Sequence, residues 1–235
     1  MTALSKLKVY ATHPHPCSYL PGQDATTLFI DPKTEVDKEL YSQLASMGFR
    51  RSGGHIYRPH CDSCKACIAS RIPVDAFEYK RKQRKISNRN NDLLVEEITD
   101  IADDEYYHLY ARYIDQRHPD GDMFPPSKDQ YLSFLTKEWG ITKFYGFREN
   151  NKLLAVAITD VMDNGLAAVY TFFDPESDRR SLGSYAILWQ IEQAKKLQLP
   201  YVFLGYWIKE CRKMNYKTDY RPLELLINDQ WLRMT

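Results

Sequence analysis

The sequence has no run of apolar residues long enough to cross a membrane. A spanning helix needs about 18–20 consecutive, mostly apolar residues, and no stretch of this chain approaches that length. The first eight residues, Met-Thr-Ala-Leu-Ser-Lys-Leu-Lys, also lack the apolar centre of a secretion signal. Internal repeats and low-complexity tracts are absent as well. We therefore expect a cytoplasmic protein without a membrane partner.

The sequence also has little net charge: 32 Lys or Arg residues against 31 Asp or Glu residues give +1. The total therefore indicates no polyanionic partner, but the distribution does. Residues 49–91 contain eleven Arg or Lys and three Asp or Glu, a local balance of +8, which leaves −7 for the rest of the chain by subtraction from +1. Such a polarised chain suits a protein that binds a phosphate backbone with one part.

Aromatic residues are abundant, with 17 Tyr, 10 Phe and 4 Trp, and 43% of the chain is hydrophobic. This composition excludes disordered and collagen-like chains. A chain of 235 residues is also long enough to bury a hydrophobic core without stabilising covalent cross-links. In the first part, periodicity predicts a helix from Val36 to Met47, a hairpin from Phe49 to Tyr57 and a strand from Ile68 to Val74. The polar stretch from Lys80 to Asn91 is interpreted as a connector.

The second part alternates helical and strand patterns. Helices are expected at Asp103 to Arg117, Lys128 to Trp139 and Ser184 to Leu197, and strands at 143–147, 153–161, 166–172, 201–206 and 223–227, with Asn164-Gly165 as a tight turn. The fold class is therefore α+β, with domains at 1–92 and 93–235. The order of elements resembles the GNAT acyltransferases, whose mixed sheet has central strands that splay to admit an acyl donor.

A cysteine cluster is the most distinctive local motif. Cys61, Cys64 and Cys67 recur at a spacing of three and can supply three thiolate ligands to zinc or to an iron–sulfur cluster. Cys17 is a candidate fourth ligand, and the alternatives are His13, His15 and His60. Five cysteines in a reducing compartment disfavour a disulfide framework. The competing interpretation is a loop of reduced thiols.

A basic run follows the cysteines. Its six cations occupy ten residues without an acid: Lys80, Arg81, Lys82, Arg84, Lys85 and Arg89. Such cations hold a nucleic acid by its phosphates without reading its sequence. The alternative is a solvated helix face.

Other candidates lie in the second part. His118 can take a proton near neutral pH, and Asp122 lies close to it in sequence, although a histidine at a helix end is often a cap. Tyr170 and Tyr206 lie near strand ends, where they can line a cleft or belong to the core. These four are the predicted catalytic residues.

Arg180 and Gly183 open the helix expected from Ser184, at the place where GNAT enzymes hold a coenzyme A pyrophosphate. They form the predicted donor loop. Tyr185 departs from that pattern, because it places a ring where the backbone must approach the pyrophosphate. Helix capping by Ser181 is the alternative role of this segment.

Taken together, these motifs resemble one family, the aminoacyl-tRNA protein transferases, in the bacterial form that moves leucine onto proteins beginning with Asp or Glu. The motifs that carry the resemblance are Cys17-Ser-Tyr-Leu-Pro, Phe49-Arg-Arg-Ser-Gly, Tyr57-Arg-Pro, Arg81-Lys-Gln-Arg-Lys, Arg117-His118, Asp120-Gly-Asp-Met, Tyr170-Thr-Phe-Phe-Asp-Pro, Arg180-Ser-Leu-Gly and Leu204-Gly-Tyr-Trp-Ile.

The resemblance implies an enzyme whose partners are charged tRNA and proteins with N-terminal Asp or Glu, and whose product enters protein degradation. The transfer itself is expected to need no cofactor. The acceptor carboxylate needs a cation, for which Arg117, Lys209, Lys217 and Arg221 are candidates. The alternatives are arginine as the donor, a coenzyme A dependent N-acetyltransferase, and a zinc-ribbon nucleic-acid module without catalysis.

Overall fold

The structure is a computed structural model, and it describes residue 4 and residues 7–135 and 140–234. Its largest element is a mixed sheet of eight strands in the order β14-β13-β7-β12-β11-β10-β9-β8. In chain order these strands are β7 (Ile68–Pro73), β8 (Leu94–Ile98), β9 (Thr142–Glu149), β10 (Lys152–Val161), β11 (Gly165–Phe173), β12 (Tyr201–Trp207), β13 (Leu223–Ile227) and β14 (Gln230–Met234). Together with the helices, this sheet confirms the α+β class.

A smaller antiparallel sheet belongs to the N-terminal part. It contains β1 (Val9–Ala11), β4 (Thr27–Ile30), β5 (Arg50–Ser52) and β6 (His55–Pro59), and α1 (Lys38–Ser46) lies between β4 and β5 in the chain. A short pair, β2 (His15–Pro16) and β3 (Asp24–Ala25), precedes β4. β7 precedes residue 92, where the sequence suggested a domain boundary, yet it lies inside the large sheet between β13 and β12.

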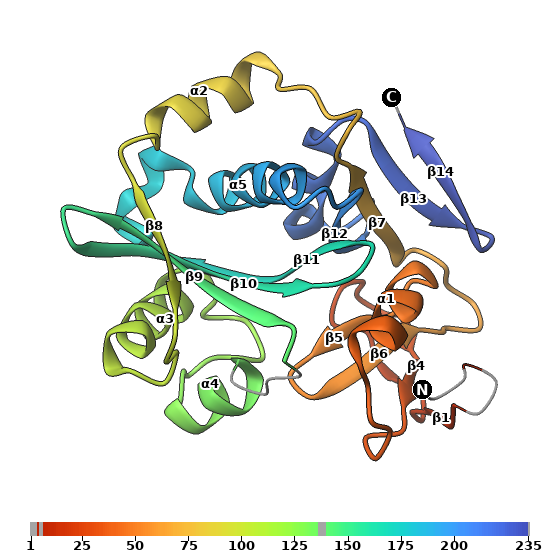
Figure 1. Cartoon of the computed structure of the whole chain (residues 1–235). Helices are drawn as coiled ribbons and strands as arrows, with labels where there is room; N and C mark the ends of the chain where they lie inside the picture. Colours follow the sequence, from red (N-terminus) through yellow and green to blue (C-terminus); the bar gives the residue numbers. More distant parts are fainter. Residues whose placement is uncertain (1–3, 5–6, 136–139, 235) are drawn as a thin grey trace.

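Helices cover both faces of the large sheet (Figure 1). On one face lie α2 (Arg81–Arg89) and α5 (Leu182–Lys196), and on the other lie α3 (Asp104–Arg117) and α4 (Lys128–Leu135). Two short 3-10 segments follow the two central strands: η2 (Pro175–Arg180) comes after β11 and η3 (Arg212–Asp219) after β12. None of the helices in the described ranges has the length and apolar composition needed to cross a membrane.

The interpretation of Lys80 to Asn91 as a connector is wrong, because Arg81–Arg89 form α2. The backbone N–H of Lys80 donates to the side-chain oxygen of Gln83 at 2.7 Å, which caps the start of the helix. Gln83 and Ile86 are buried, at 5% and 6% exposure. Only these two side chains anchor the helix face, so its sequence lacks the apolar stripe that identifies most helices.

The other predicted helices and the 164–165 turn are confirmed. α3 begins after Asp103, whose carboxylate accepts the N–H of Glu105, and Asn164-Gly165 falls between β10 and β11. The helix expected from Lys128 is α4; it is described to Leu135, and residues 136–139 lie outside the described residues.

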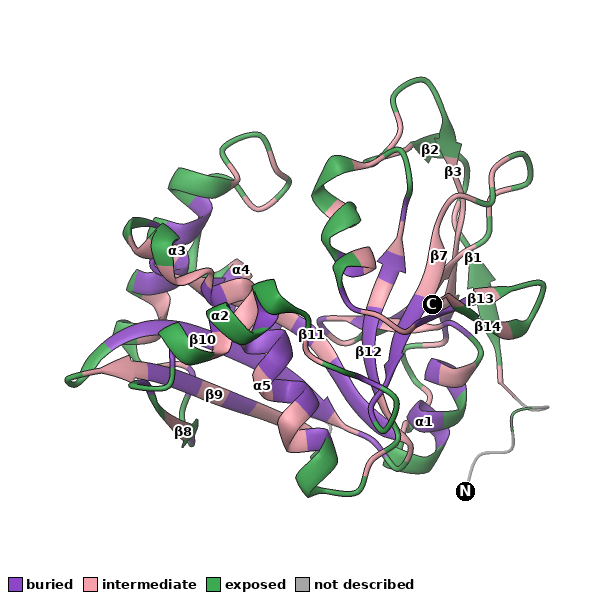
Figure 2. Cartoon of the chain, turned by 90° about the horizontal axis from the view of Figure 1, so that it is seen from above, coloured by how far each residue is buried: buried purple, intermediate pink, exposed green. Residues whose placement is uncertain are grey.

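The two central strands separate after a short parallel pairing. β11 and β12 are paired at Gly165–Tyr201, Leu166–Val202 and Ala167–Phe203, and beyond this point they diverge (Figure 2). This is the splayed parallel pair expected from the acyltransferase resemblance. The ends of β11 and β12 lead directly into η2 and η3, so these two segments flank the opening between the strands.

Candidate active site

Arg50 fills the opening between the diverging strands. Its Nη2 donates to the carbonyl oxygens of Val169 at 2.8 Å and Ala168 at 3.3 Å on β11, and its Nη1 donates to that of Leu204 at 3.3 Å on β12. The guanidinium therefore satisfies carbonyls that no longer pair across the two strands. Gly205 has φ +74°, and a Cβ there would lie 1.5 Å from Nη1 of Arg50, so only glycine leaves room for the guanidinium.

His118 lies beside α3 on one side of this opening. Its Nε2 shares a hydrogen bond of 3.1 Å with the Tyr113 hydroxyl, and the two rings are 5.1 Å apart. Burial, followed by the charges of Lys213 and Arg117, lowers the pKa of His118, so its neutral form is favoured. Tyr170 is 6.5 Å from Tyr113 between ring centroids. The structure thus links two predicted catalytic residues through Tyr113 of α3.

The other two predicted catalytic residues lie elsewhere. The Tyr206 hydroxyl donates to the carbonyl of Gly48 at 2.8 Å and lies 3.1 Å from that of Tyr57, while burial raises its pKa well above the ordinary value. These contacts attach β12 to the N-terminal sheet. Asp122 is exposed on the loop after α3. The four residues therefore do not converge on one point.

The four acceptor candidates are also spread over the surface and interior. Arg117 pairs with Asp178 at 2.9 Å and is 44% exposed, and Lys209 is exposed just after β12. Arg221 donates through Nε to the carbonyl of Thr218 at 3.1 Å and lines a shallow pocket with Lys80 and Arg233. Lys217 is 1% exposed. These positions cannot bind one carboxylate together.

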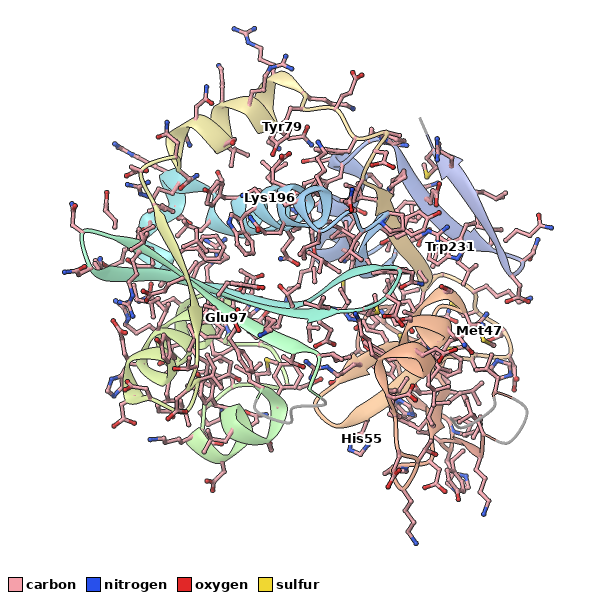
Figure 3. All side chains as sticks on the ribbon, in the orientation of Figure 1. Met47, His55, Tyr79, Glu97, Lys196 and Trp231 are labelled. Atoms are coloured by element: carbon pink, nitrogen blue, oxygen red, sulfur yellow. The ribbon has the colours of Figure 1, made fainter. Side chains whose placement is uncertain are left out.

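The basic helix α2 lies at the rim of the opening, because it is attached to both flanking segments. Lys82 pairs with Asp219 of η3 at 3.0 Å, and Gln83 donates to the carbonyl of Asp219 at 3.0 Å. At the other end Arg89 donates to the carbonyl of Arg179 in η2. The nitrogen-tipped side chains of α2 point away from the sheet (Figure 3). The predicted tRNA-binding cations are thus presented to solvent next to the diverging strands.

The predicted donor loop is occupied by internal contacts. Arg180 pairs with Asp92 at 2.8 Å and also with Glu149, and it donates to the carbonyl of Arg89 at 3.1 Å. A Cβ at Gly183 would lie 3.1 Å from the Phe173 ring, so glycine here allows α5 to pack against β11. Ser181 precedes α5 but makes no side-chain cap, so the alternative role of helix capping is wrong.

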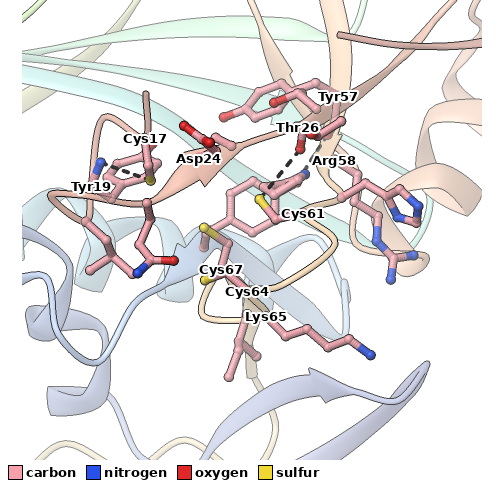
Figure 4. A pocket seen from close by; sticks show the side chains of 18 of the residues that line it. Cys17, Tyr19, Asp24, Thr26, Tyr57, Arg58, Cys61, Cys64, Lys65 and Cys67 are labelled. Atoms are coloured by element: carbon pink, nitrogen blue, oxygen red, sulfur yellow. Dashed lines mark hydrogen bonds between the residues drawn. The ribbon is translucent and has the colours of Figure 1, made fainter. Parts of the chain in front are cut away.

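Cys17, Cys61, Cys64 and Cys67 line a pocket of about 460 Å³ between the N-terminal sheet and the edge of the large sheet. Figure 4 shows Cys61, Cys64 and Cys67 on one side and Cys17 near Tyr19 on the other. Burial, followed by the charges of the neighbouring thiols, raises the pKa of Cys67 to about 12. This shift favours the protonated thiol in the arrangement described.

The four thiols do not form a converged ligand set in this structure. The N–H of Tyr19 donates to Cys17 Sγ at 3.4 Å, and Cys61 Sγ donates to the carbonyl of Thr26 at 3.8 Å. Across the described ranges, no three His, Cys, Asp or Glu side chains are placed to hold one metal ion. The metal site therefore stays a prediction.

Comparison with known proteins decides the family. One family model, described as the N terminus of arginine-tRNA-protein transferase, matches residues 15–85, and its C-terminal counterpart matches residues 105–227. The chain belongs to this family. It is 57% identical to the aspartate/glutamate leucyltransferase of Stutzerimonas stutzeri (strain A1501) over 235 residues, which is 100% of both chains.

A second relative gives the same result. The aspartate/glutamate leucyltransferase of Pseudomonas fluorescens (strain Pf0-1) is 57% identical over 232 residues, which is 99% of each chain. Among solved structures, that of FemX is similar with a TM-score of 0.47 at 10% identity, covering 86% of this chain and 80% of that chain. The family predicted from the motifs is confirmed, and so is its implication that the chain is an aminoacyltransferase.

Proposed function

We propose that this enzyme transfers leucine from leucyl-tRNA to the α-amine of proteins that begin with Asp or Glu. The observation that carries the proposal is 57% identity over the whole length to a protein named for that activity. The new N-terminal leucine would mark the acceptor for degradation, as the family resemblance implies. We propose that the enzyme acts in the cytoplasm, where charged tRNA would be available to it.

The chemistry needs little from the protein beyond orientation. The α-amine attacks the carbonyl carbon of the tRNA ester, a peptide bond forms, and the ester C–O bond breaks to return the ribose hydroxyl. The amine gives up one proton overall, and its pKa of about 7.7–8.0 leaves part of it neutral at cellular pH. The ester is already activated, so the reaction requires no covalent enzyme intermediate. The transfer also requires no cofactor in this proposal.

The cations of α2 are proposed to hold the tRNA. They stand at the rim of the opening between β11 and β12, and α2 is attached to both η2 and η3. A phosphate backbone on α2 would therefore bring the aminoacylated end of the tRNA to this opening. His118, whose neutral form is favoured, is the proposed acceptor of the amine proton, with Tyr113 orienting its ring.

The coenzyme A alternative has no supporting contact among the described residues. Arg180, the residue that would face a pyrophosphate, is paired with Asp92 and Glu149 instead. Arg50 occupies the space between the splayed strands. Both observations favour a donor that stays outside the sheet, such as the end of a tRNA.

A transfer assay tests the proposal. Each reaction contains purified protein, a peptide beginning with Asp and one radiolabelled donor. The three donors, tested in separate reactions, are leucyl-tRNA, arginyl-tRNA and acetyl-coenzyme A. We expect label on the peptide only from leucyl-tRNA. Transfer from arginyl-tRNA alone would establish the other donor, and transfer from acetyl-coenzyme A alone would refute tRNA dependence.

A further inference from the structure

Two adjacent arginines of β5 differ in how their charges are neutralised. Arg51 forms a fully buried ion pair with Asp160, with both N–O distances at 2.8 Å. Arg50 donates only to backbone carbonyls and makes no ion pair with any carboxylate of the described residues. These carbonyls replace part of the hydration of the guanidinium but supply no negative charge, so Arg50 has no anionic partner among the described residues. Arg50 therefore leaves the floor of the opening positively charged.

Lys217 is a second cation of this kind. It is 1% exposed, and the nearest acceptor of its ammonium group is the sulfur of Met214 at 3.1 Å, a weak acceptor. Within the described ranges it forms no ion pair. Burial, then the charge of Arg50, lowers its pKa to about 7, with Cys211 acting in the opposite direction. Lys217 is therefore a buried amine without an anionic partner among the described residues.

The ring of Tyr216 lies over the Lys217 ammonium, with its centroid 4.5 Å from the nitrogen. This cation–π contact supplies a partial negative charge in place of an anion. Tyr216 is itself 44% exposed, so the residue that contacts the Lys217 ammonium group reaches the surface.

The same place is close to the proposed proton acceptor. Lys213 of η3 pairs with Asp120 at 3.8 Å, and Asp120 lies two residues after His118. An acceptor whose α-amine lies at His118 is therefore beside η3, the segment that carries Tyr216 and Lys217.

We infer that Lys217, supported by the charge of Arg50, forms the subsite that binds the side-chain carboxylate of the acceptor's first residue, with the ring of Tyr216 beside it. This inference rests on the proposed function. A carboxylate restores the anion that both cations lack, and a lysine offers three donors, none of which has an oxygen partner among the described residues. A tRNA phosphate is the less suitable ligand, because it is carried on a bulky backbone and the subsite is buried.

Lys217→Met tests the subsite, since methionine keeps the apolar length and removes the charge. Initial rates are measured with labelled leucyl-tRNA and two peptides that differ only in a first residue of Asp or Ala. We expect kcat/KM to fall about 10- to 100-fold for the Asp peptide and to stay within about twofold for the Ala peptide. The matched control is Arg212→Met, which removes an exposed cation from the same η3 segment and leaves both rates unchanged.

Thermal unfolding of Lys217→Met separates binding from a structural role. Removing an unpaired buried charge should leave Tm unchanged or higher while the Asp-specific rate falls. Equal losses for both peptides, or an unchanged preference for Asp over Ala, would overturn the subsite. If the wild-type enzyme transfers leucine to neither peptide, the proposed function itself fails, and that result is distinct from a failure of the subsite.

Discussion

Two groups of cations in this molecule are held in opposite ways. On α2 the cations are exposed and gathered on one helix, whereas Arg50 and Lys217 are enclosed between elements far apart in the chain. Exposed cations act through a long-range field that salt screens and that suits an extended polyanion. Enclosed cations act at contact distance and suit one small anion. The difference indicates that one protein can bind a nucleic acid and an acidic residue with separate sets of charges.

The largest expected effect comes from removing the exposed group. Replacing Arg81, Lys82, Arg84 and Lys85 by Ala should weaken leucyl-tRNA binding about 10²- to 10³-fold at physiological salt and flatten its salt dependence. Filter binding over a range of salt concentrations measures both. Two double variants give a matched comparison. Arg84→Ala with Lys85→Ala should weaken leucyl-tRNA binding about tenfold, and Lys8→Ala with Lys33→Ala on the N-terminal part should leave this binding almost unchanged. Equal effects of the two pairs would contradict a role for α2.

The second prediction concerns stability and compares a paired with an unpaired buried cation. Asp160→Asn leaves Arg51 without its anion and should lower the free energy of unfolding by about 3–5 kcal/mol. Lys217→Met should leave the free energy of unfolding unchanged, because no anionic partner is lost. Urea denaturation of the two variants gives the comparison. A Lys217→Met variant destabilised as strongly as Asp160→Asn would mean that the ammonium group is part of the core.

The third prediction is a pH dependence with a definite sign. The pKa of Lys217 is lowered to about 7, so the ammonium form dominates below pH 7 and is lost above it. Its charged neighbours are Arg50 and Cys211, with Tyr216 against it. For the Asp peptide, kcat/KM should therefore fall above neutral pH by up to about tenfold per pH unit. Deprotonation of the acceptor α-amine acts in the opposite direction, because it raises kcat/KM with pH. In Lys217→Arg the side chain stays charged over this pH range, so the fall in kcat/KM should disappear. A pH profile of this variant identical to that of the wild type would contradict the assignment of the fall to Lys217.

The same shift affects stability in the opposite direction. Between about pH 7 and the ordinary lysine pKa, the unfolded chain binds more protons at Lys217 than the folded chain does, so stability rises with pH in that window. The rise should be absent in Lys217→Met. Denaturation midpoints at pH 7 and pH 9 measure it.

The smallest expected effect is that of metal removal. We expect a chelator to leave the transfer rate within about twofold, because the cysteine pocket is not required for the proposed ester transfer. The check is a rate measurement before and after dialysis against a chelator, with the metal content determined in both samples. A loss of transfer that zinc or iron restores would show that the pocket serves the reaction.

Local sequence patterns predicted much of the fold. α3, α5 and the turn at Asn164-Gly165 follow from apolar spacing and turn chemistry within one segment. The helix α2 could not be predicted in this way, because only Gln83 and Ile86 are buried on it and its anchors belong to η2 and η3, far away in the chain. The place of β7 inside the large sheet was missed for the same reason, since strand pairing is non-local.

The site was predicted less completely than the fold. The sequence identified Lys217 as one of four cations for the acceptor, but its burial depends on the whole arrangement of η3 and Arg50, which lies 167 positions earlier by subtraction. Arg50 was noted only as part of a family motif. Tyr113 lies within the helix expected at Asp103 to Arg117, but its hydrogen bond with His118 arises from the geometry at the end of α3.

The most direct test measures KM for both substrates in one set of enzymes at low and high salt. The enzymes are the wild type, the four-residue α2 variant, Lys217→Met and their combination. We predict that the α2 variant raises only the KM for leucyl-tRNA and flattens its salt dependence, that Lys217→Met raises only the KM for the Asp peptide, and that the combination multiplies the two effects. If either variant changed both KM values by the same factor, the two groups of cations would not serve separate substrates.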